Sequence, residues 1–207
     1  MRARHLVAWF GYVQLFTKGL ERLPATVCDD TVPRDMVIRV LPKARAANER
    51  GDSLGAGDGF DFYCTVTTSD DALLWGRAYR GSGGTRRIAQ VSAVGVEAVT
   101  ELDSEGGESG VYVPCAPPGV PPEDYAIVTD VYAHTYERSG DTGDGQHVEV
   151  TDTALHQTLT DMAYRLTGHA YEPAECKAPR AFPEELPRYK IRRSGGGLPR
   201  FTCQSAQ

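Results

Sequence analysis

The residues of this sequence that are equipped for chemistry are its five cysteines and a group of histidines in its second half. These histidines are His134, His147, His156 and His169. A zinc site or a general base would need two or three of them to converge with a carboxylate, and no cysteine stands at zinc-ligand spacing from a histidine. His156 follows Leu155 in a predicted helix, off its apolar stripe, and is expected to face solvent. The sequence therefore predicts no catalytic residue, no metal ligand and no cofactor.

A dispersed site is the alternative. Asp130, His134, His147 and Glu149 would have to gather in one pocket, as in a small-ligand-binding protein or an enzyme. The chain has no G-x-S-x-G elbow, no phosphate loop ending in Lys-Ser/Thr and no EF-hand series of ligands. These absences favour a non-catalytic domain as the leading interpretation.

The cysteines predict a disulfide framework. They are Cys28, Cys64, Cys115, Cys176 and Cys203, at wide spacings and without a C-x-x-C pair. Disulfide frameworks persist in oxidising compartments, so the expected location is extracytoplasmic, on the outer side of a cell membrane or secreted. A cytosolic protein with unrelated buried thiols is the competing interpretation.

The charge balance argues against nucleic acid as a partner. Acidic groups outnumber basic groups by 28 to 22, which gives a net charge of −6 at pH 7. No long stretch of Lys and Arg builds the positive face that a phosphate backbone requires.

The N-terminus predicts an association with a membrane. Arg2 and Arg4 precede the apolar residues 6–16, and basic followed by apolar is the order of an export signal. The run is shorter than the ~20 residues that span a bilayer. Three interpretations are open: the end of a transmembrane helix that starts before this sequence, an uncleaved interfacial helix, or an amphipathic helix packed on the domain. We favour membrane association, because the aromatic cluster before Lys18 suits a membrane interface.

Strands are predicted by alternation of polar and apolar residues. The pattern is clearest at 60–68, where Phe60, Phe62, Cys64 and Val66 alternate with polar residues. Further strands are expected at 72–80, 111–113 and 125–136. Residues 89–102 fit either a strand or a helix, and loops are expected at 44–59 and 103–110.

Two helices are predicted. The first covers 31–41, with Pro33 at an early position and Pro42 after its end. The second covers 153–167 and is expected to stop before Gly168. Its apolar stripe consists of Leu155, Leu159, Met162, Ala163 and Leu166. Gln157 lies off this stripe, so its replacement by alanine is expected to cost little. The elements together predict an α+β fold with a mainly antiparallel sheet, on which a short N-terminal helix and a longer late helix pack.

Short motifs around the cysteines resemble a pattern in small exported actinobacterial proteins. The motifs are Cys28 with VPRDMV at 32–37, Leu41-Pro42, Phe62-Tyr63-Cys64, Val113-Pro114-Cys115, and Glu175-Cys176. These proteins are largely uncharacterised envelope lipoproteins and single-pass membrane proteins. The resemblance implies a disulfide-paired α+β envelope domain and no known reaction. The chain departs from the lipoproteins because no lipobox precedes Cys28.

The expected disulfides join Cys28 to Cys64 and Cys115 to Cys176. Each pair would tie one element end to another across the core, and Cys203, near a chain end, would remain unpaired. A Cys176–Cys203 bond, which would leave Cys115 unpaired, is the main alternative.

Three regions are expected along the chain. Residues 1–27 form a membrane-proximal segment or the remnant of a signal or anchor, and 28–176 form the disulfide-bonded domain. Residues 177–207 form a Pro/Arg/Gly-rich tail or the start of a second unit. The expected function is that of a non-catalytic, membrane-tethered extracytoplasmic domain that binds an envelope protein partner or contributes to the cell envelope.

Overall fold

The structure is a computed structural model that describes residues 18–82, 90–93, 96–103, 106–115, 125–134, 153–176, 182, 186, 190–192 and 200–202. Its elements are η1 Leu20–Arg22, β1 Thr26–Val27, β2 Val32–Pro33, α2 Arg34–Val40, β3 Ala47–Leu54, η2 Gly57–Gly59, β4 Asp61–Thr68, β5 Leu73–Ser82, β6 Gln90–Ala93, β7 Val96–Asp103, β8 Gly106–Pro114, β9 Tyr125–His134, α3 Thr153–Tyr171, β10 Lys190–Arg192 and β11 Arg200–Thr202.

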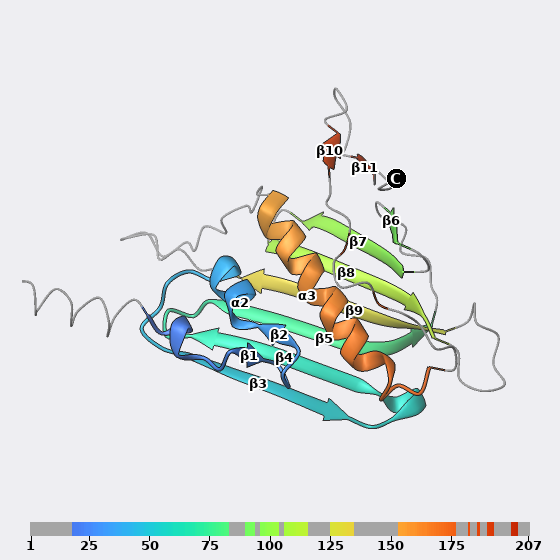
Figure 1. The fold of residues 1–207 in the computed structure, drawn as a ribbon, viewed down its shortest axis with the longest axis horizontal. Helices are drawn as coiled ribbons and strands as arrows, with labels where there is room; N and C mark the ends of the chain where they lie inside the picture. Colours follow the sequence, from blue (N-terminus) through green and yellow to red (C-terminus); the bar gives the residue numbers. More distant parts are fainter. Residues whose placement is uncertain are drawn as a thin grey trace, which may run out of the picture.

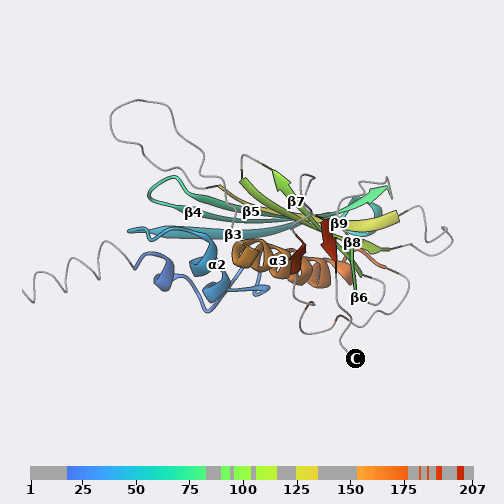
Figure 2. The same cartoon turned by 90° about the horizontal axis from the view of Figure 1, so that it is seen from above.

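The centre of the fold is one antiparallel 7-stranded sheet with the order β3-β4-β5-β9-β8-β7-β6 (Figure 1). Two 2-stranded sheets, β1-β2 and β10-β11, accompany it. Helices α2 and α3 lie on the same side of the large sheet (Figure 2). The predicted α+β fold is therefore confirmed.

The alternation of apolar and polar residues along the strands places apolar side chains on the helix-covered face of the sheet. On β4, Phe62, Cys64 and Val66 are buried, whereas the residues between them are at least partly exposed. The same period of two continues on β5 and β9, where Leu74, Ala78, Ile127 and Val131 are buried. One face of each strand thus supplies the core beneath the helices.

Helix α3 is the main element on that face, and its predicted stripe is buried. Leu159, Met162, Ala163 and Leu166 are at most 1% exposed, while Leu155 is partly buried against the same core. The helix comes so close to β5 that a Cβ added at Gly76 would lie 2.7 Å from Leu166 Cδ1. A glycine at this position lets the helix pack directly on the sheet.

The core extends beyond residues 28–176. Leu20 and Leu23 are buried in the same cluster as α2, and Leu186 is 4% exposed. Phe182 packs against Tyr164 and Tyr171 of α3, with ring centroids 5.7 and 5.3 Å apart. Two segments outside the cysteine framework therefore help to close the core.

The predicted loops at 44–59 and 103–110 were wrong. The first contains β3, whose residues lack apolar alternation, and the second contains the start of the Gly-rich strand β8. Pairing of β3 with β4, and of β8 with β7 and β9, determines these strands more than the β-propensity of their own residues does. Residues 89–102, which fit either a strand or a helix in the sequence, contain β6 and all of β7 except Asp103.

The predicted end of α3 before Gly168 was also wrong, because the helix continues to Tyr171. Glycine inside a helix costs about 1 kcal/mol relative to alanine. The next turn buries Ala170 and Tyr171, and this burial outweighs that cost. The chain leaves the helical region at Glu175, whose φ is +55°.

Two polar residues of α3 were expected at the surface and are buried. His156 is 5% exposed and Gln157 is 6% exposed. The main-chain oxygen of His156 accepts a hydrogen bond from Thr160 Oγ1 at 2.9 Å, and Gln157 Nε2 donates to Asp161 Oδ1 at 2.9 Å. The buried face of α3 is therefore wider than its apolar stripe and includes these two polar residues.

No helix among the described residues is long and apolar enough to cross a membrane. Residues 6–16, on which the membrane prediction depends, lie outside the described residues.

Candidate binding face of the sheet

The side of the sheet opposite α2 and α3 carries a group of aromatic and charged side chains. Residues that pair across antiparallel strands point to the same face, so β4, β5 and β9 align their outward positions in rows. We call this group the aromatic face; its members are Asp61, Tyr63, Thr65, Trp75, Arg77, Tyr79, Asp130 and Tyr132. All of them are partly exposed.

Arg77 lies at the centre of the aromatic face. Its Nε donates to Asp61 Oδ1 at 2.9 Å and its Nη2 donates to Asp61 Oδ2 at 2.6 Å, in a two-pronged contact. The guanidinium carbon also lies 4.6 Å from the ring centroid of Tyr79 and 5.2 Å from that of Tyr63. The Tyr63 hydroxyl donates to Asp61 Oδ2 at 2.6 Å. These contacts hold Arg77 in one orientation between two rings.

The same contacts alter the acidity of the groups involved. Burial raises the pKa of Asp61, but hydrogen bonds from Arg77 and Tyr63 and the charge of Arg77 outweigh it, so the pKa lies below its usual value. The hydrogen bond to Asp61 is the largest cause that raises the pKa of Tyr63 and of Arg77. The cluster is therefore an ion pair at neutral pH.

Trp75 and Tyr132 form the second half of the face. They are register partners on β5 and β9, and their ring centroids are 5.0 Å apart with an interplanar angle of 30°. Asp130 is the register partner of Arg77 on the same pair of strands. The face thus combines four aromatic rings with charges of both signs.

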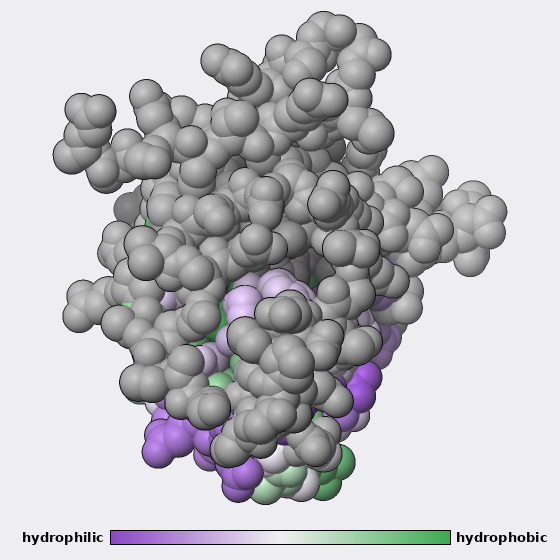
Figure 3. Space-filling view, turned by 90° about the vertical axis from the view of Figure 1, so that its right-hand side faces the viewer, coloured by the Kyte–Doolittle hydropathy of each residue, from purple (hydrophilic) through white to green (hydrophobic). Residues whose placement is uncertain are grey.

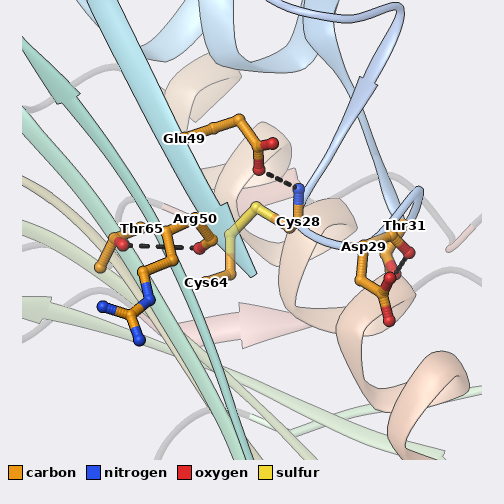
Figure 4. Close-up of a disulfide and its surroundings, with 7 residues drawn as sticks. All are labelled: Cys28, Asp29, Thr31, Glu49, Arg50, Cys64 and Thr65. Atoms are coloured by element: carbon orange, nitrogen blue, oxygen red, sulfur yellow. Dashed lines mark hydrogen bonds between the residues drawn. A yellow bond between two sulfur atoms is a disulfide. The ribbon is translucent and has the colours of Figure 1, made fainter. Parts of the chain in front are cut away.

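The Cys28–Cys64 disulfide supports β4 from the opposite side (Figure 4). The Cα atoms are 5.1 Å apart, and both residues are at most 2% exposed. Cys64 lies between Tyr63 and Thr65 of the aromatic face, so its side chain points to the core side. The bond ties the chain around Cys28 to the strand that positions this face.

The turn at Cys28 has an uncommon backbone. Cys28, Asp29 and Asp30 have φ values of 59°, 57° and 56°, a left-handed conformation that costs L-residues roughly 1–2 kcal/mol each. A Glu49 carboxylate oxygen accepts a hydrogen bond from the Cys28 N–H (Figure 4), and the two atoms are 3.0 Å apart. Thr26 Oγ1 donates to Asp30 Oδ1 at 2.6 Å. These bonds and the disulfide keep the turn in place.

The second disulfide joins Cys115, just after β8, to Cys176, after α3, with Cα atoms 4.9 Å apart. Both expected pairs are therefore present. Cys203 lies outside the described residues.

The dispersed site considered from the sequence is not assembled by the described residues. Asp130 and His134 share one face of β9 but stand four residues apart, about 13 Å along the strand. His147 and Glu149 lie outside the described residues. His156 is buried in α3, and His169 Nε2 lies 3.4 Å from Asp29 Oδ2 beside the Phe62 ring. Within the described part of the chain, no cluster of His, Cys, Asp and Glu could hold a metal ion.

Large exposed aliphatic groups are few among the described residues. They are Ile38, 39% exposed, and Leu54, 54% exposed. The coloured surface in Figure 3, seen from the right of Figure 1, is mostly hydrophilic with a small hydrophobic patch at its lower edge. The candidate binding surface is therefore the mixed aromatic face and not an aliphatic groove.

The sequence interpretation missed the aromatic face, although a signal for it exists. Asp61, Tyr63 and Thr65 alternate along β4, and Trp75, Arg77 and Tyr79 alternate along β5. Polar aromatic and charged residues at the outward positions of both arms of one hairpin predict a shared surface. The hairpin itself was predicted.

Comparisons with protein-family models, curated proteins and solved structures gave no match to this chain. The fold and the site therefore define its class on their own. It is a disulfide-bonded α+β domain with a helix-covered sheet face and an opposite face that carries three Tyr, one Trp and one Arg beside two Asp.

Asp61→Asn is expected to destabilise the protein at neutral pH and to lose this effect in acid. Because the pKa of Asp61 is lowered in the folded state, its carboxylate stabilises the fold above its unfolded pKa of ~3.9, and this contribution is lost as pH falls through the folded pKa. Urea unfolding from pH 7 to acid should show a constant difference from wild type above about pH 5 and a shrinking one below about pH 4.

The control is Thr67→Ala, an exposed, non-titrating position on the same strand. Its effect on the unfolding free energy should not change with pH. A difference between wild type and Asp61→Asn that stays equally large in acid would contradict the role assigned to the ion pair.

Proposed function

We propose that this chain is a non-catalytic extracytoplasmic domain that binds an envelope protein through the aromatic face and is tethered to a membrane by the segment before Cys28. The observation that carries the proposal is Arg77 held between Tyr63 and Tyr79, beside the tilted ring pair of Trp75 and Tyr132.

The composition of the face supports a protein partner. Trp, Tyr and Arg are the residues that most often dominate the energy of protein interfaces, because they offer large contact areas together with hydrogen-bonding groups. Arg77 and Asp61 already hold each other, so a partner would meet side chains that are ordered before binding. Pre-ordered side chains reduce the entropy lost on association.

The disulfides support the location. Two disulfides within the domain suggest an oxidising, extracytoplasmic environment. The tether rests on the sequence, in which basic residues precede the apolar and aromatic run at 6–16.

Site-specific photo-crosslinking in cells tests the binding face. A photoreactive amino acid at Thr65, among the aromatic side chains, should give one discrete protein adduct identified by mass spectrometry. Trp75→Ala should reduce its yield at least about tenfold, because truncation of a central interface aromatic costs ~2 kcal/mol or more.

Two controls use the opposite side of the molecule. The same photoreactive group at Arg165, exposed on α3, should not give this adduct, and Arg165→Ala should not reduce the yield from Thr65. Equal adducts from both positions, or only polysaccharide adducts from Thr65, would contradict the proposal.

Cell fractionation tests the tether. Replacing Trp9, Phe10 and Tyr12 by serine should move the protein from the membrane fraction to the soluble fraction. Retention in the membrane fraction would contradict the tether.

A further inference from the structure

Strand β3 is an edge of the large sheet, and no other strand among the described residues pairs with its outer side. It is the terminal member of the order β3-β4-β5-β9-β8-β7-β6 and runs along the lower border of the sheet in Figure 1. An edge strand presents unpaired N–H and C=O groups, which can pair with another strand.

Two hydrogen bonds show which residues of β3 point toward the free edge. Ser69 N–H donates to Ala46 O at 2.9 Å, and Thr65 Oγ1 reaches Arg50 O at 3.5 Å. The main-chain groups of the even-numbered residues therefore point toward β4. By alternation, those of Glu49, Gly51 and Ser53 point to the free edge. Among the described residues, none forms a hydrogen bond with the Gly51 N–H or C=O beyond the strand.

Two-fold symmetry restricts how a second copy could pair with this edge. An antiparallel pair related by a two-fold axis must place one residue opposite its own copy. With Glu49, Arg50 or Asp52 on the axis, like charges would face each other, which destabilises a strand pair. With Gly51 on the axis, Arg50 of each copy faces Asp52 of the other.

Gly51 also suits the axis for a steric reason. A Cβ added there would lie 2.8 Å from Asp29 N and 2.9 Å from Cys28 C, so the turn of the same chain already covers its inner side. No side chain would stand at the axis, because the residue there is Gly51 in both copies, and the two backbones could approach to hydrogen-bonding distance.

The charges at this edge are free to change partners. Arg50 Nη2 lies 2.9 Å from Asp52 Oδ2 within one chain, and the two side chains are 77% and 46% exposed. A pair this exposed contributes little to folding. In the two-fold register, Arg50 and Asp52 of different copies form the non-hydrogen-bonded type of pair, in which side chains come closest.

We propose that β3 pairs with β3 of a second copy of this chain, antiparallel and centred on Gly51, so that the two sheets form one continuous sheet. The two copies then show their aromatic faces on the same side, because a two-fold axis normal to the sheet keeps like faces together. A contact made by one strand of 8 residues from each copy buries less surface than a standard interface, so the dimer should be weak and concentration-dependent. This proposal does not depend on the proposed function.

Exchange of charges at the edge gives a decisive test. The full chain with Cys203→Ser, which removes an intermolecular disulfide as an explanation, is studied by sedimentation velocity from micromolar to near-millimolar concentration. We expect a monomer–dimer equilibrium for this protein. Arg50→Asp and Asp52→Arg should each weaken dimerisation at least about tenfold, because each places two pairs of like charges across the axis.

The rescue experiments separate pairing from misfolding. An equimolar mixture of the Arg50→Asp and Asp52→Arg proteins should form heterodimers, because opposite charges again face each other, and the double variant R50D/D52R should regain the homodimer. A monomer at all concentrations would overturn the proposal, as would single variants that dimerise like the parent or a mixture that stays monomeric.

Discussion

Replacing Cys28 and Cys64 together by alanine is expected to lower the free energy of unfolding by about 4 kcal/mol. The bond closes a loop with a sequence separation of 36, and the chain-entropy relation assigns about this value to such a loop. The disulfide also holds the left-handed turn at 28–30 against strand β4, and strain released from that turn on removal of the bond would reduce the loss. Urea unfolding of the oxidised proteins, monitored by circular dichroism, measures the difference.

The variant with only the Cys115–Cys176 bond provides its own control. Adding a reductant should lower its stability further, because the second bond, with a separation of 61, is still present. A loss below about 1 kcal/mol on removing Cys28 and Cys64 would show that the remaining contacts hold the turn without the disulfide.

Leu159→Ala is expected to lower the free energy of unfolding by ~2–5 kcal/mol. Leu159 is fully buried on α3, which packs against β8 and β9, and the removed side chain would leave a cavity. Thermal and urea unfolding measure the loss.

The matched control is Arg165→Ala, an exposed position on the same helix, which should change the unfolding free energy by less than about 0.5 kcal/mol. Gln157 is unsuitable as a control, since it is buried and bonded to Asp161. Similar losses at Leu159 and Arg165 would contradict the packing of α3 described above.

The parts of the fold that could be predicted are those whose own residues carry the pattern. The alternation around Phe62 and Cys64 gives β4, and the apolar spacing from Leu155 to Leu166 gives α3. Turn residues between β4 and β5 gave the hairpin, and Asp71 has the left-handed φ of +63° that such a turn uses.

Strand β3 could not be predicted, because its inward residues serve contacts made by distant parts of the chain. Glu49 points inward and binds the Cys28 N–H, and Gly51 leaves room for the backbone of Cys28 and Asp29. A carboxylate and a glycine at inward positions resemble a loop when the sequence is considered alone.

The candidate site could be predicted only in part, for a related reason. The outward residues of β4 and those of β5 are each visible in the sequence as an alternating row. Asp61 contacts Arg77, however, only through the strand register that the turn at 69–71 sets. The contact of Trp75 with Tyr132 joins residues on β5 and β9, which a long stretch of sequence separates. The histidines stand out more clearly in the sequence, but the structure does not bring the described ones together.

The position of the Cys28–Cys64 bond also determines how the domain would carry mechanical load. A pull on the chain ahead of Cys28 would first act on the packing of Leu20 and Leu23 and then pass through the sulfur atoms into β4. Helix α2 and strand β3 lie within the closed loop, so tension along the covalent chain would bypass them. Strand β4 is hydrogen-bonded to neighbours on both sides, so the load would enter the sheet beside the strand that carries Arg77. If the segment before Cys28 is a tether, the disulfide keeps the edge and the helix unstretched while the molecule is held under tension.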